Sequence, residues 1–128
     1  MSYAKRHRIS VTTDTDGDAT KYTPVVSGIV SQIVYTKPAS GGLDTATFAI
    51  TGETTGVSVW SESGVNASKT VVPTQPATDQ AGTNATYDGT RVVRAPIYLA
   101  QERVKIVISN AGSDNKGTFD VIVTGPTG

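Results

Sequence analysis

Short runs of alternating β-branched and polar residues, each ended by a glycine- or Asp/Asn-rich break, recur along this chain. One covers residues 45–50 (Thr-Ala-Thr-Phe-Ala-Ile) and stops at the Gly- and Thr-rich residues 51–56. Others cover residues 57–60, 103–108 and 118–123. A period of two is typical of strands with one buried face. No window of helical length is free of β-branched runs, Gly or Pro. The pattern predicts an all-β protein: an antiparallel β-sandwich or jelly roll of about eight strands, with little or no helix.

Four further strands complete the expected set. They cover residues 8–13, 19–23, 29–35 and 91–99, and residues 71–72 offer one more short strand. A chain of 128 residues is long enough for one two-layer core and too short for two. We therefore expect a single β-sandwich domain over residues 9–125, preceded by a basic N-terminal arm over residues 1–8.

Two segments stand apart from the strand pattern. The arm carries consecutive basic or titratable residues from Lys5 to Arg8. Residues 61–89 hold two prolines, several Gly and Asn residues and few large apolar ones, so they are expected to form a long loop region. The residues expected at a partner interface are Tyr3, Lys5, Arg6, Arg8 and Trp60. A solvated terminal tail and a core tryptophan are the alternative interpretations.

The overall composition favours packing against other proteins over binding a charged polymer. Charged residues make up 17% of the chain and the formal net charge is zero. Low charge suits a protein held against neighbours, although a Thr-rich β protein with an ordinary surface explains it as well. The charge balance predicts no nucleic-acid partner. The chain has no cysteine, no apolar stretch of 18 residues and no signal-type apolar segment, so neither disulfides nor a membrane span are expected.

One acidic turn resembles the start of a calcium loop. Asp14, Asp16 and Asp18 have the right spacing, but such a loop needs Gly at its sixth position and Glu at its twelfth. Ala19 and Val25 occupy those positions. The residues favour a β-turn, because Asp side chains cap turns and Gly17 accepts a positive φ; a weak cation site is the alternative.

The chain offers little for catalysis. His7 is the single histidine, and no Gly-x-Ser-x-Gly nucleophile motif accompanies it. Glu53, Glu62 and Glu102 lie in different segments, so nothing in their spacing predicts a carboxylate pair. We expect no catalytic residue, no cofactor and no metal site, and hence no enzyme.

Four segments, in order along most of the chain, carry a resemblance to a known family. They are residues 9–13 with the acidic turn and residues 19–20 behind them, residues 50–56, residues 99–108 and residues 117–119. In these the chain resembles small proteins encoded in the head-assembly regions of tailed bacteriophages and prophages. The resemblance implies a structural role in the virion and supplies no catalytic residues.

The leading functional hypothesis is a capsid decoration or cement protein. It would bind the outside of the major capsid shell of a tailed phage as a homo-oligomer (a dimer or trimer), and be found in the virion after assembly in the host cytoplasm. One alternative is a head–tail connector or other tail-associated part. Another is a carbohydrate-binding β-sandwich, which would need several exposed aromatic residues, whereas aromatics are 6% of the chain.

Overall fold

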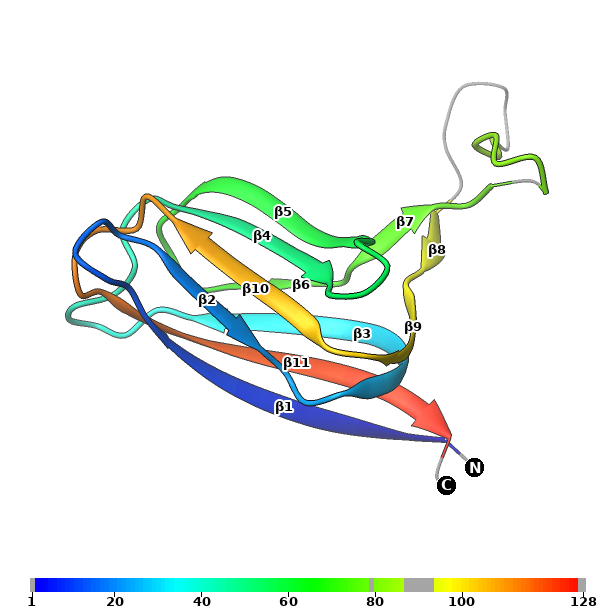
Figure 1. The fold of residues 1–128 in the computed structure, drawn as a ribbon, viewed down its shortest axis with the longest axis horizontal. Coiled ribbons are helices and arrows are strands. Elements are labelled where there is room, and N and C mark those ends of the chain that lie inside the picture. The colour runs from blue at the N-terminus through cyan, green and yellow to red at the C-terminus, as the bar shows by residue number, and fades with distance from the viewer. Residues whose placement is uncertain (1, 79, 87–93, 127–128) are drawn as a thin grey trace.

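The computed structural model describes residues 2–78, 80–86 and 94–126 of the chain. These residues form eleven strands (Figure 1) and no helix, which confirms the all-β prediction and exceeds the expected strand number. None of them therefore forms a helix that could cross a membrane. Most strands belong to two antiparallel sheets that pack face to face as a sandwich.

The first sheet has the strand order β1-β11-β3-β6, and β9 also pairs with β3. Its members are β1 (Ser2–Thr12), β3 (Val26–Thr36), β6 (Lys69–Val71), β9 (Tyr98–Glu102) and β11 (Lys116–Pro126). The register of β1 and β11 continues without a break from one end of β1 to the other, so the two ends of the described chain lie together (Figure 1).

The second sheet has the order β2-β10-β4-β5. It consists of β2 (Ala19–Tyr22), β4 (Ala46–Gly52), β5 (Ser58–Val65) and β10 (Val104–Ser109). In β4 and β10 every second residue is buried, as the alternation of the sequence predicts.

Four aromatic rings fill the space between the sheets. Phe48 lies at the centre, with its ring centroid 5.0 Å from those of Tyr35 and Phe119 and 5.1 Å from that of Trp60. All three contacts are close to edge-on, the geometry that aromatic pairs prefer. Tyr35, Phe48 and Phe119 are completely buried. The core therefore joins β3 and β11 of one sheet to β4 and β5 of the other.

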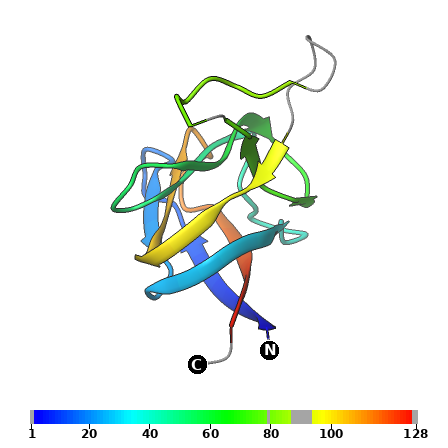
Figure 2. The ribbon, with the colours of Figure 1, turned by 90° about the vertical axis from the view of Figure 1, so that its right-hand side faces the viewer.

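A third, much smaller sheet projects from the sandwich, which we call the body. β7 (Thr74–Pro76) and β8 (Arg94–Pro96) form a two-stranded ribbon that carries residues 77–78 and 80–86 away from the sandwich (Figures 1 and 2). Ala85 donates its N–H to the carbonyl oxygen of Ala77 at 2.7 Å, which continues the pairing beyond the ribbon. We call β7, β8 and the described residues between them the projection.

The prediction of a separate N-terminal arm over residues 1–8 is wrong. Residues 2–12 form one continuous strand, so the basic residues belong to β1 and to the domain. The physical reason is the length of β11, which reaches Pro126 and offers a backbone partner as far as Ser2. A strand needs backbone partners along its whole length, and apolar side chains only where one face is buried.

The expected long loop over residues 61–89 is also wrong in its first part. β5 continues to Val65, β6 pairs with β3 and β7 pairs with β8. Residues 79 and 87–89 of this segment lie outside the described residues. β6 overlaps the short strand expected at residues 71–72, whereas β7 is only three residues long, too short for the alternation to reveal.

The acidic turn between β1 and β2 agrees with its prediction. Gly17 has a φ of +83° and donates its N–H to the carbonyl oxygen of Asp14 at 3.2 Å. A Cβ at this position would meet the backbone nitrogen of Gly112 at 2.9 Å, so the neighbouring β10–β11 turn also requires glycine here.

Candidate protein-interaction surfaces

The basic residues of β1 are arranged by the pleat of the strand. Arg8 lies directly opposite Asp120 of β11, and its Nε and Nη2 atoms donate to the two carboxylate oxygens at 2.9 and 3.2 Å. Asp120 is 6% exposed, and these hydrogen bonds from Arg8 lower the pKa of its carboxyl group. Arg8 thus holds a carboxylate that is otherwise nearly buried, and its guanidinium is not a free partner contact.

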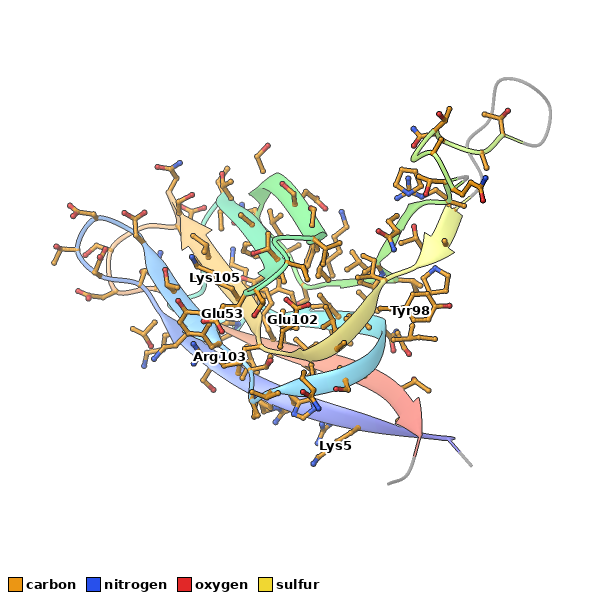
Figure 3. All side chains as sticks on the ribbon, turned by 45° about the vertical axis from the view of Figure 1, so that its right-hand side comes forward. Lys5, Glu53, Tyr98, Glu102, Arg103 and Lys105 are labelled. Atoms are coloured by element: carbon orange, nitrogen blue, oxygen red, sulfur yellow. The ribbon has the colours of Figure 1, made fainter. Side chains whose placement is uncertain are left out.

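The neighbouring basic residues have no such partner in the described interactions. Lys5 and Arg6 are exposed, and Lys5 points away from the body (Figure 3). His7 is half-buried; burial lowers its pKa, and the charge of Lys5 lowers it further, so the imidazole is neutral at pH 7. The backbone of Tyr3 lies in β1, while its side chain is outside the described residues. The structure thus places the four predicted contact residues of the amino-terminal segment on one strand.

Trp60 does not stand on the surface as an interface residue would. It is 7% exposed, packs edge-on against Phe48, and donates its Nε1–H to the carboxylate of Glu62 at 3.1 Å. The structure therefore assigns it to the core, which was the alternative interpretation. Its polar neighbours Ser61 and Ser63 face solvent on the other side of the strand.

A groove of about 590 Å³ runs beside Trp60 at the base of the projection. One wall is the β5 segment 57–61, and the other is the segment 71–76, which includes β7. Arg94 closes the groove and is the one charged residue in its described lining. Val72 is 67% exposed here, although most of the described valines are buried or half-buried. Sequence reasoning missed this groove, because its two walls meet only through the sandwich fold.

Glu102 is buried and has a structural role that the sequence did not reveal. It is 4% exposed, and its carboxylate accepts hydrogen bonds from the backbone N–H groups of Thr54 and Thr55 at 3.0 and 3.1 Å. The next residue, Arg103, pairs with Glu53 and places its guanidinium 4.2 Å from the ring centroid of Tyr22 (Figure 3). These contacts fasten the β4–β5 turn to the β9–β10 junction.

The acidic turn uses its first carboxylate as a cap. The Oδ1 atom of Asp14 accepts the N–H groups of Asp16 and Asp18 at 2.9 and 3.0 Å. No group of His, Asp and Glu side chains able to hold a metal ion is found among the described residues. The geometry is that of a turn whose own backbone satisfies the aspartate.

Comparison with known proteins adds one weak likeness. No protein-family model and no curated protein matches the chain. A solved structure described as the crystal structure of FLHE aligns over 95% of this chain and 96% of that chain, with 9% sequence identity and a TM-score of 0.38. A TM-score this low supports no conclusion about function.

Proposed function

We propose that this chain is a non-enzymatic structural protein of a virion, a capsid decoration protein that binds the major capsid shell of a tailed phage as a dimer or trimer. The observation that carries the proposal is the projection. A two-stranded ribbon that leaves a well-packed sandwich suits a protein whose task is to contact neighbours. The resemblance of the chain to head-assembly proteins and its low charge point in the same direction.

The projection has little to hold it in place by itself. None of the six residues of β7 and β8 is buried. Its ladder is only three residue pairs long, with Thr74 opposite Pro96, Gln75 opposite Ala95 and Pro76 opposite Arg94. Isolated two-stranded ribbons are marginally stable in water. Contact with a partner would offset the cost of ordering, about 1–2 kcal/mol for each residue.

The aromatic side chains do not favour a carbohydrate-binding module. Such a face needs several exposed rings. Four of the described rings belong to the core cluster, and Arg103 lies over one face of Tyr22, which is 38% exposed. Tyr98, 65% exposed, lies on β9 of the other sheet, so the exposed rings among the described residues share no face. A head–tail connector or other tail-associated part, in contrast, uses a projection equally well and is the second candidate.

The test is to replace residues 77–93 by the two-residue turn Asn-Gly, which joins β7 to β8 directly. We expect the shortened protein to keep its melting temperature within a few degrees and to lose at least about tenfold in capsid affinity, which corresponds to about 1.4 kcal/mol. Co-sedimentation with purified capsids measures the affinity.

Thr15→Ala, in the exposed turn at the other end of the molecule, is the matched control and should bind like the parent. Electron microscopy of particles carrying the parent protein then shows where it sits. Density over the shell supports decoration, and density confined to the neck supports the connector. Absence of the protein from particles would overturn both.

A further inference from the structure

The strand β1 is a long open edge. It pairs with β11 on one side, and its other side carries no strand among the described residues. β2 packs near it but pairs with β10. An edge strand of eleven residues presents a row of unpaired backbone groups, which proteins usually shorten, bulge or cover. The pairing of β1 has no bulge.

The ladder shows which backbone groups face outward. Thr13, just past β1, donates its N–H to the carbonyl oxygen of Asn115 at 2.8 Å and continues the register of β1 and β11. Bonded and non-bonded pairs alternate along an antiparallel ladder. The odd-numbered residues of β1 therefore bond to β11, and the N–H and C=O groups of Arg6 and Arg8 point to the open edge.

The charges of the side chains along β1 determine which kind of strand can pair with its open edge. A second copy of β1 would bring the basic run from Lys5 to Arg8 against itself, and like charges on opposed strands are destabilising. The single carboxylate of Asp120 pairs with Arg8 and also interacts electrostatically with Arg6, whereas Lys5 has no acidic partner in the described interactions. An acidic strand would place carboxylates beside these basic side chains. Its backbone would also pair with the N–H and C=O groups of β1 that face the open edge.

We propose that the open edge of β1 binds an extended acidic segment of a partner protein, which adds to the first sheet as a further strand. This deepens the proposed function, because the segment would belong to the shell that the protein decorates. Backbone hydrogen bonds would give the affinity, and Lys5 and Arg6 would select acidic side chains.

The test uses the isolated full-length protein and three labelled eight-residue peptides with blocked ends: alternating Glu and Thr, alternating Gln and Thr, and the Glu–Thr peptide with a methyl group on every backbone nitrogen. Fluorescence anisotropy measures binding. We expect the Glu–Thr peptide to bind best and the Gln–Thr peptide to bind about threefold more weakly for lack of charge. The N-methylated peptide should bind at least about tenfold more weakly, because it has no backbone N–H to donate to β1. Equal binding of the N-methylated peptide would overturn the proposal, since charge alone would then suffice.

Protein variants locate the site. Lys5→Gln/Arg6→Gln should weaken the Glu–Thr peptide about threefold, as one exposed ion pair predicts, because Lys5 and Arg6 face opposite sides of β1 and the glutamates of the peptide lie on one side only. Lys37→Gln/Lys105→Gln removes the same charge elsewhere and should bind like the parent. Backbone amide shifts should appear at Arg6 and Arg8; shifts confined to another strand, or no binding at millimolar peptide, would overturn the inference. Because no capsid is present, a failure here leaves the capsid-binding test intact.

Discussion

The sandwich body and the projection are built from the same kinds of residue but stabilised in different ways. In the body, aromatic and branched side chains from both sheets bury one another, and Phe48 alone contacts three other rings. In the projection, no residue of β7 or β8 is buried, and the described contacts are polar: Arg94 with Thr74, and the Gln75 side chain with the Pro96 carbonyl.

The difference shows which interactions stabilise each of the two parts. Buried apolar area stabilises the body whatever surrounds the protein. The projection exchanges hydrogen bonds to water for hydrogen bonds to itself, which yields little net free energy. We therefore expect the body to unfold as one cooperative unit and the projection to open independently of it.

Phe48→Ala should break the body and gives the largest expected effect. Removing the central ring leaves a cavity between the sheets, and such truncations cost about 3–5 kcal/mol. That is a large part of the 5–15 kcal/mol or so by which domains are usually stable. Urea unfolding followed by tryptophan fluorescence measures the loss. Val72→Ala, at an exposed valine of the groove, is the control; a comparable loss there would contradict the contrast between core and surface.

Tyr35→Phe should sharpen the contrast by stabilising the body. The Tyr35 hydroxyl is buried and has no hydrogen-bond partner, so its removal should raise the free energy of unfolding by about 1 kcal/mol at pH 7 while the ring contacts remain. Tyr98→Phe, at an exposed ring, should bring no such gain. A loss of stability in Tyr35→Phe would show that the hydroxyl is satisfied after all.

The same residue predicts how stability changes at alkaline pH. Burial raises the pKa of Tyr35 to about 12, against an ordinary value of 10.0. Between these values the folded state holds a proton that the unfolded state has lost, so ionisation of Tyr35 does not affect the free energy of unfolding below pH 10 and lowers it as the pH rises from 10 to about 12. Urea titrations across this range should therefore show a smaller loss of stability in Tyr35→Phe than in the parent protein.

The sequence predicted the body well because burial leaves a local trace. Phe48 and Ile50, or Ile106 and Ile108, alternate with small or polar residues, and each pair faces the core. The acidic turn was also predictable, since Asp14 and Gly17 satisfy its geometry within a few residues.

The surfaces were harder to predict because distant segments create them. The basic half of β1 has little apolar signal and is a strand because β11, more than a hundred positions away along the chain, pairs with it. The groove likewise needs β5 and the segment 71–76 side by side. Trp60 was named as an interface candidate because its sequence neighbours are polar, whereas its own side of β5 faces Phe48.

Arg94→Ala tests the projection and should give the smallest effect on global stability. Arg94 donates from Nε to the Thr74 hydroxyl at 3.0 Å and from Nη2 to the Thr74 carbonyl oxygen at 2.8 Å, joining the two strands of the ribbon. Because it is exposed, its loss should change the free energy of unfolding by less than about 0.5 kcal/mol. The ribbon itself should open more often, so hydrogen exchange at Gln75 and Ala95 should accelerate while exchange at Ile106 stays unchanged.

Lys69→Ala, which removes an exposed cation paired with Glu62 on the body, is the matched control and should leave exchange in the ribbon as it was. If exchange at Gln75 and Ala95 is no faster in the Arg94 variant than in the parent, contacts with the body stabilise the ribbon. The two regions would then not open independently.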